Sequence, residues 1–341
     1  MKEFGSDFHY VKSIGNGKTL FDIFPKANLY ANGRQAIDAL ILQEKWKRIW
    51  MPEYFCYEII DSVKKNDIEI CFYSDNPLLN DDAEISKLQF LEGDVFFRMN
   101  YFGNRKFRDN SVLKVPVIED HSHDLIGVWP LNSNADWCIA SLRKTLPISE
   151  GGILWSPKNH NLPGLPKQSE LNVQLSYKRW TAMQLKKDYL SDEIIDKGLF
   201  RKLFLETESE FDILQIAPIA EDCYSYLVNF DMEGWLHQKQ LNWNILAEIQ
   251  SDKIFILKGE SEKCNNFSFT LIFYNPFDRD VVKRFLIANN IYPAVLWEIP
   301  EDRVDSKDIS DRMLSIACDG RYSYDDMLIL KSAITKALED V

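Results

Sequence analysis

The chain has 341 residues, of which 45% are hydrophobic and 27% charged, so it can bury the core of a large domain and a smaller one. Its 52 acidic residues outnumber the 40 basic ones, and the net charge of −12 argues against general affinity for nucleic acid or anionic membranes. There is no export signal and no apolar run long enough to cross a bilayer, so we expect a cytoplasmic protein. The six cysteines form no CxxC pair and are expected to be reduced thiols.

From about residue 30, helical and extended patterns alternate. Helices are predicted within residues 32–48 and 56–66, with strands at 49–52 and 68–73. Further strands are predicted at residues 94–100, 115–120, 136–141 and 151–156. This rhythm indicates an α/β domain with a mainly parallel sheet.

A long charged helical region is predicted over residues 175–214, and a second alternation follows it. It comprises a helix near 237–250, strands at 253–259 and 267–274, a helix at 279–290, a strand at 292–297 and a final helix at 323–338. We place the boundary near residue 220, which gives a large domain of residues 1–220 and a small α/β domain of residues 221–341.

Two residues that could carry chemistry follow predicted strands. Lys144 lies on a loop that Pro147 and the glycines of residues 151–152 prevent from becoming a regular helix. Asp120 ends another strand, 24 residues earlier in the chain. Ligands bind beyond the carboxyl ends of the strands in such sheets, so both residues are expected to face one crevice.

A third feature is a helix start that could bind phosphate. Asn32 is a good N-cap, and the free backbone amides that follow it belong to Gly33, Arg34 and Gln35. A lysine, a carboxylate and a phosphate cradle together describe a site for pyridoxal 5'-phosphate. The phosphate would also be held by Ser141 or Arg143.

Several segments resemble the DegT/DnrJ/StrS-type aminotransferase family of fold type I pyridoxal-phosphate enzymes: VIEDHSH, SLRKTLPISEGG and GRQAI. That family has an E-D-x-x-[QH] strand end, which Asp120 and His123 match. It also has a lysine followed six residues later by the glutamate of EGG, which Lys144 and Glu150 match. The resemblance covers most of the chain. It implies an enzyme that moves an amino group from an amino-acid donor to a keto substrate, such as a keto-sugar or a nucleotide-sugar.

The resemblance also implies roles for single residues. Lys144 would form the Schiff base, Asp120 would bind the ring nitrogen, and His123 would contact the ring hydroxyl or stack nearby. Asn100 would help to hold that hydroxyl. The family places an aromatic that stacks on the cofactor at the position of Cys56, where Phe55 or Tyr54 would substitute.

The family further implies a homodimer whose active sites lie at the subunit interface. The candidate substrate contacts are Tyr177, Arg179 and Arg321. The alternative for Arg321 is a surface ion pair with Asp319 or Asp325.

Three alternatives stay open. A metal site could use His121 and His123 with Asp120 or Asp124, but an extended segment would put the histidines on one face and the acids on the other. The S-x-x-K pattern of Ser141 and Lys144 matches serine acyl-enzymes, but no K-T-G follows it. The chain could also be a non-catalytic regulator or scaffold, or could catalyse another reaction of the cofactor, such as dehydration or decarboxylation.

Overall fold

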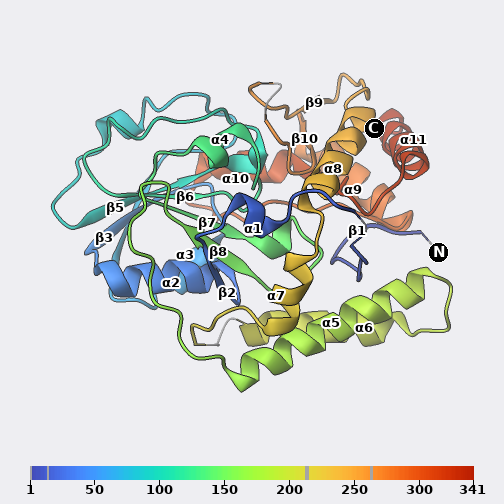
Figure 1. The fold of residues 1–341 in the computed structure, drawn as a ribbon. Helices are drawn as coiled ribbons and strands as arrows, with labels where there is room; N and C mark the ends of the chain where they lie inside the picture. The colour runs from blue at the N-terminus through green and yellow to red at the C-terminus, as the bar shows by residue number, and fades with distance from the viewer. Residues whose placement is uncertain (1, 14, 212–214, 262–263) are drawn as a thin grey trace.

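The computed structural model describes residues 2–13, 15–211, 215–261 and 264–341. Figure 1 shows a large sheet with its helices in one half of the molecule and a small sheet beside the C-terminal helix in the other. Among the described helices, none has the length and apolar composition needed to cross a membrane.

The large sheet has seven strands in the order β2-β8-β7-β6-β5-β3-β4. Its strands are β2 (Asn28–Tyr30), β3 (Arg48–Pro52), β4 (Glu69–Tyr73), β5 (Asp94–Met99), β6 (Val117–Asp120), β7 (Trp137–Ser141) and β8 (Gly152–Trp155). Only β8 runs antiparallel to its neighbours β2 and β7 in this sheet, so the predicted mainly parallel sheet is confirmed.

Each face of this sheet has its own apolar core. Successive strand residues point to opposite faces, so Ile118 packs in one core and Val117 in the other. Helix α2 (Gly33–Glu44) contributes Ile37 and Leu40 to the first core. The shorter helices α1 (Leu20–Ile23), α3 (Tyr57–Val63), α4 (Val128–Asn132) and α7 (Glu221–Val228) flank the strands.

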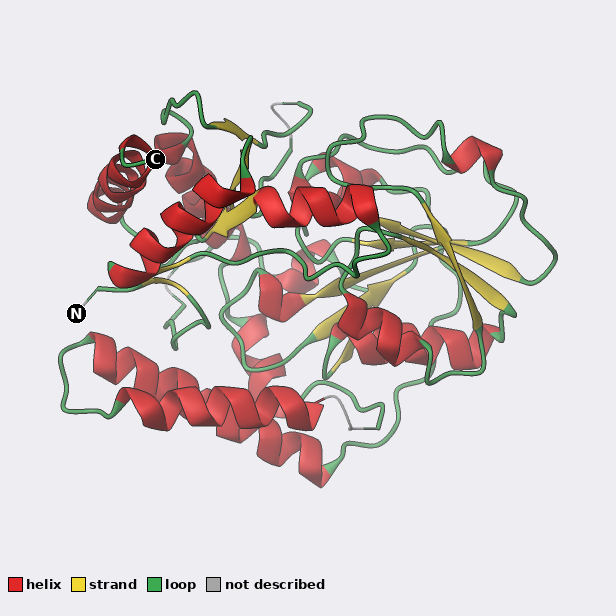
Figure 2. Ribbon diagram, turned by 180° about the vertical axis from the view of Figure 1, so that it is seen from behind, coloured by secondary structure: helices red, strands yellow, loops and turns green. Residues whose placement is uncertain are grey.

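Helices α5 (Glu170–Leu190) and α6 (Lys197–Phe211) form a hairpin along the lower edge of Figures 1 and 2. The helical region predicted over residues 175–214 therefore begins earlier and is interrupted by a turn. Its last three residues, 212–214, lie outside the described residues. Phe200 and Phe204 on α6 pack against Ala182 and Met183 on α5.

The second sheet is antiparallel, in the order β12-β10-β9. Its strands are β9 (Ile254–Ile256), β10 (Phe269–Phe273) and β12 (Met313–Ile316), and its helices are α8 (Met232–Leu246), α9 (Pro276–Ala288) and α11 (Tyr324–Glu339). The N-terminal strand β1 (Phe4–Gly5) pairs in parallel with β11 (Ile291–Tyr292), so the first residues lie beside the C-terminal part of the chain.

Two expectations for this region are wrong. The strand predicted at 292–297 is limited to β11, with an isolated bridge from Ala294 to Ser315. The sequence pattern also missed α10 (Val304–Arg312) and β12. The domain boundary near residue 220 stays a prediction.

Candidate active site

The carboxyl ends of β6 and β7 bring the predicted lysine and acid together. Asp120 pairs with Ile139 across the two strands, and the backbone N–H of Ser141 donates to Ser122 Oγ at 2.8 Å. Lys144 follows in the short 3₁₀ helix η3 (Leu142–Lys144). The charge of Lys144 lies close enough to lower the pKa of Asp120, although burial of that carboxyl is the larger effect and raises it.

Lys144 has an amine that is free to react. Its side chain is exposed, and it makes no hydrogen bond or ion pair with any residue in the described part of the chain. With Arg143 it lines a cavity of about 630 Å³. Its charge also influences the thiol of Cys56, whose pKa burial raises.

Asp120 is buried, at 2% exposure, and does not line that cavity. One carboxylate oxygen, Oδ1, accepts a hydrogen bond from the backbone N–H of Ser122 at 2.8 Å. Burial raises the pKa of Asp120, while Ser122 and Lys144 favour its charged form. A cation placed beside this carboxyl would therefore be well compensated.

His123 has a neutral ring enclosed by aromatic side chains. Its Nδ1 accepts from the backbone N–H of Phe102 at 3.3 Å, and its ring stacks on Phe267 with centroids 4.3 Å apart and on Trp297 at 5.6 Å. Burial lowers the pKa of His123 well below its usual value, and the charge of Lys144 adds to this. The second ring nitrogen, Nε2, has no partner among the described residues, so it is available to donate a hydrogen bond.

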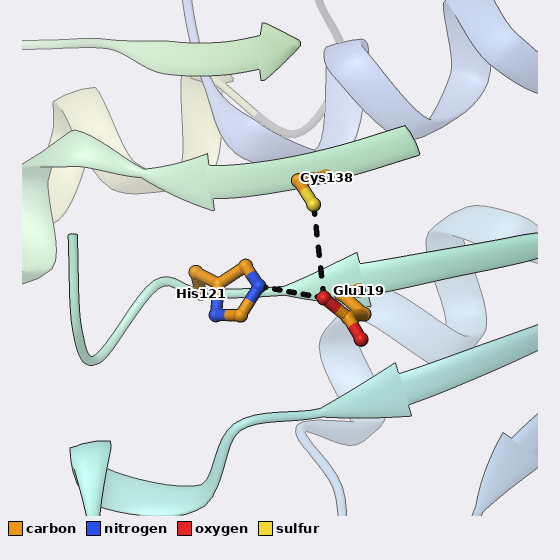
Figure 3. A group of neighbouring side chains, drawn as sticks. All are labelled: Glu119, His121 and Cys138. Carbon is orange, nitrogen blue, oxygen red and sulfur yellow. Dashed lines mark hydrogen bonds and ion pairs between the residues drawn. The ribbon is translucent and has the colours of Figure 1, made fainter. Parts of the chain in front are cut away.

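His121 lies in a separate network, shown in Figure 3. Its Nε2 lies 3.0 Å from Glu119 Oε2, which is 3.8 Å from Cys138 Sγ. Its Nδ1 lies 3.2 Å from the amide nitrogen of Asn100, whose buried Oδ1 has no partner in the described chain. All three residues drawn in Figure 3 are completely buried.

The expectation that an extended segment puts His121 and His123 on one face is wrong. The chain turns after Asp120 instead of staying extended, because the backbone N–H of Asp124 bonds to the carbonyl of His121 at 2.9 Å. The two rings therefore lie in different surroundings. A different group, Glu119, His121 and Cys138, has ligand atoms within 4.8 Å of one another, but hydrogen bonds already engage those of Glu119 and His121.

The start of α2 lies against the end of β7. Asn32 caps the helix by accepting from the backbone N–H of Gln35 at 3.0 Å. A Cβ on Gly33 would lie 3.3 Å from the Cβ of Ser141, so the predicted phosphate residues Gly33 and Ser141 are neighbours. The side-chain Oε1 of Gln35 accepts from the backbone of Ala217 at 2.9 Å.

Three arginines converge on one carboxylate beside this helix start. Glu208 on α6 accepts from Arg143 at 2.7 and 3.1 Å and from Arg179 at 2.9 Å, and Arg34 lies 3.9 Å away. Burial would raise the pKa of Glu208, but Arg143 and Arg179 outweigh it and hold that pKa far below its usual range. The place is therefore suited to an anion. Glu208 thus contacts both Arg143, which was predicted to bind the phosphate, and Arg179, which was predicted to bind the substrate.

The remaining predicted residues are dispersed. Phe55 is fully buried, with its ring centroid 5.3 Å from Phe97 and 5.7 Å from Trp297. Tyr177 is 71% exposed on α5 and does not line the cavity. Arg321 lines the cavity and makes two hydrogen bonds to Asp319, at 2.8 and 2.9 Å; the partner is one considered for its alternative, but the ion pair is buried and not on the surface.

Sequence reasoning missed three basic residues of the cavity, Lys186, Arg201 and Lys239. Lys239 on α8 is 2% exposed, and its Nζ has no hydrogen-bond partner in the described chain. It shares the buried face of α8 with Trp235, Leu236 and Trp243, at helical spacing. A lysine on the apolar face of a predicted helix was the signal that could have marked it.

No protein-family model matches this chain, and no curated protein sequence matches it. Its fold, however, matches solved structures. PseC of Helicobacter pylori, an aminotransferase involved in the biosynthesis of pseudoaminic acid, is 12% identical over 100% of both chains, with a TM-score of 0.64. NtdA of Bacillus subtilis, solved with bound cofactor PMP, is 13% identical over 92% of this chain and 73% of its own, with a TM-score of 0.62.

A DegT DnrJ EryC1 StrS aminotransferase from Brucella abortus is 11% identical over 92% of this chain and 86% of its own, with a TM-score of 0.58. The expected fold type I architecture is thus confirmed. At these identities the likeness shows the fold alone, and function has to be argued from the site.

Proposed function

We propose that this chain is a pyridoxal-phosphate-dependent aminotransferase. The observation that carries the proposal is the unpaired amine of Lys144, just beyond β7, near the buried carboxyl of Asp120 at the end of β6. Solved structures with the same fold that are aminotransferases, from Brucella abortus and Helicobacter pylori, support it, as does the PMP bound to NtdA.

The residues present fit four groups of the cofactor: the aldehyde, the ring nitrogen, the hydroxyl and the phosphate. Lys144 would bind the aldehyde, and Asp120 would face the ring nitrogen. The hydroxyl would be held by the free Nε2 of His123 and by Asn100, whose Oδ1 lacks a partner among the described residues. Gly33 and Ser141, at the start of α2 and the end of β7, would hold the phosphate.

When bound, the cofactor supplies an electron sink that makes the proton on the amino-bearing carbon of a substrate acidic. The Lys144 amine would first act as a general base and take that proton. It would then act as a general acid and release a proton. Asp120 would keep a positive charge at the ring nitrogen, because its carboxylate is buried and has few other partners. The stacked rings around His123 would limit the access of water.

The donor would be an amino acid and the acceptor a keto compound, of which a keto-sugar is one class. Seven basic and three acidic side chains line the cavity, so an acceptor that carries negative charge fits it best. The basic ones are Arg143, Lys144, Arg179, Lys186, Arg201, Lys239 and Arg321. We also propose a homodimer in the cytoplasm, with the exposed Tyr177 reaching a partner subunit.

The test is covalent attachment of the cofactor. Purified protein is mixed with pyridoxal phosphate, its visible absorbance is recorded, borohydride is added, and the labelled peptide is identified by mass spectrometry. The label should be on Lys144, be absent in Lys144→Ala and persist in Lys158→Ala, because Lys158 is a surface lysine paired with Asp136. Bleaching of the absorbance by an amino donor would then show the half-reaction.

One observation favours a second candidate, a non-catalytic protein with this fold. Glu208 occupies Arg143 and Arg179 beside the start of α2, where an incoming phosphate would find the arginines already neutralised. The same experiment decides between the two. A wild-type chain that takes up no cofactor, yet is folded and monodisperse, would favour the scaffold.

A further inference from the structure

A buried lysine that the proposed chemistry does not use lies in the wall of the cavity. Lys239 comes from α8, and its Nζ is enclosed without a hydrogen-bond partner among the described residues. Leaving an ammonium group buried and unpaired destabilises a fold, because the group loses its water without gaining a partner. Burial accordingly lowers the pKa of Lys239.

The surroundings of Lys239 leave its charge only partly compensated. Asp124, Cys318 and Asp319 are near enough to favour its protonated form, but burial is the larger effect. Asp319 is held by Arg321, and Oδ1 of Asp124 accepts from the backbone N–H of Gly127 at 2.7 Å. These acids are therefore engaged elsewhere.

Hydroxyl groups line the same cavity. Ser268 and Ser315 line the cavity, are each 5% exposed, and have their Oγ atoms 2.7 Å apart. Ser268 follows Phe267, which stacks on His123. The charges of Lys144 and Lys239 both add to the lowering of the pKa of His123, and both lysines line the cavity.

We infer that Lys239, with the hydroxyls of Ser268 and Ser315, forms a subsite for one carboxylate group of a ligand in this cavity. One cation with neutral hydroxyl donors matches a single negative charge. A phosphate dianion would bring a second charge that the buried group could not compensate. The assignment of the carboxylate to an amino-acid substrate rests on the proposed function, whereas the subsite itself does not.

The test compares small probes on the full chain without added cofactor. Propanoate, its neutral analogue propanamide and inorganic phosphate are titrated, and binding is followed by saturation-transfer NMR and by the rise in melting temperature. Propanoate should bind, and propanamide should not. Lys239→Met should weaken propanoate binding at least about tenfold, because it removes a charged hydrogen bond.

The test also needs a control variant and a measurement of stability. Lys187→Met removes the same charge from α5 outside the cavity, where the ammonium lies over the ring of Tyr10, and should leave propanoate binding unchanged. Lys239→Met should also melt at the same temperature as the wild type or higher, because a buried unpaired charge is gone. A purely structural lysine predicts the opposite, a lower melting temperature.

Unchanged propanoate binding in Lys239→Met would overturn the inference. So would a variant that melts several degrees lower or cannot be purified, or phosphate binding that depends on Lys239 more than propanoate binding does. Cofactor attachment at Lys144 is measured separately on the same variant. Attachment without a carboxylate effect counts against this inference alone, and a carboxylate effect without attachment counts against the proposed function alone.

Discussion

Two buried carboxyl groups lie at the same edge of the large sheet in different settings. Asp120 has a nearby cation in Lys144. Glu150, just before β8, instead accepts from the backbone N–H of Ala220 at 2.5 Å and from the side chain of Asn172 at 3.2 Å, and its Oε2 has no described partner. Asp120 is thus suited to hold a charge, and Glu150 to join segments of the chain.

The setting of Glu150 predicts a pH dependence of stability. Burial raises its pKa to about 8, while the unfolded chain releases this proton near the usual value of 4.5. Between these values the folded state binds more protons than the unfolded state, so the free energy of unfolding falls as pH rises. Between pH 5 and pH 8 this group should lower the free energy of unfolding of the wild type by a value on the order of 3 kcal/mol. Glu150→Gln should not show this decrease.

Urea unfolding at several pH values measures this difference. Glu92→Gln removes an exposed carboxyl by the same substitution and should give a curve parallel to that of the wild type. If the Glu150→Gln curve is also parallel to the wild type, Glu150 is charged in the folded protein and the proposed protonation is wrong.

At the scale of elements, β8 and the start of α2 approach so closely that one residue must be glycine. A Cβ on Gly152 would lie 2.2 Å from the carbonyl oxygen of Asn32, which is backbone and cannot move aside as a side chain can. Gly152→Ala should therefore lower the free energy of unfolding by roughly 1–3 kcal/mol or more, and should displace the cap of α2.

The matched control is Gly164→Ala, where an added Cβ meets nothing within 4 Å. That variant should lie within about 0.5 kcal/mol of the wild type. Chemical unfolding of both variants gives the comparison. Equal stability of the two would mean that β8 and α2 are further apart than described.

Elements differed in how well the sequence predicted them. Six of the seven strands of the large sheet were predicted because buried strands read as short apolar runs between helices, whereas the three-residue edge strand β2 was missed. The run YPAVLW is similarly apolar, yet only Tyr292 of it belongs to a strand, β11, whose partner is β1 at the other end of the chain, and Ala294 makes an isolated bridge. A single-sequence pattern carries no information about a partner that distant.

The candidate site divides in the same way. Lys144 and Asp120 were predicted from spacing and strand ends. The turn that separates His121 from His123 depends on hydrogen bonds within a few residues, and local composition did not reveal it. Lys239 and Glu208 reach the cavity only through the packing of α8 and α6, so the sequence marks Lys239 no further than by its place on an apolar helix face.

At the scale of the whole molecule, the N-terminal segment connects parts that are far apart in sequence. Phe4 packs in the core of the small sheet, and the backbone N–H of Gly5 donates to the hydroxyl of Tyr322 at 2.8 Å. Two residues further on, the carbonyl of Asp7 accepts from Lys186 on α5 at 2.6 Å. Residues 5–8 also line the cavity. The segment therefore joins the α5–α6 hairpin to the small sheet across the proposed site.

Phe4→Ala should loosen this connection. Phe4 is 4% exposed, with its ring centroid 5.2 Å from that of Tyr322, and truncating a buried phenylalanine costs about 3 kcal/mol. We expect a lower free energy of unfolding together with faster proteolytic cleavage within the first 13 residues. Phe277→Ala makes the same change at a side chain that is 66% exposed on α9, and should alter neither. A Phe4→Ala protein with wild-type stability and unchanged cleavage would mean that the segment is held by its polar contacts alone, and then the Asp7 contacts with α5 would have to carry the connection.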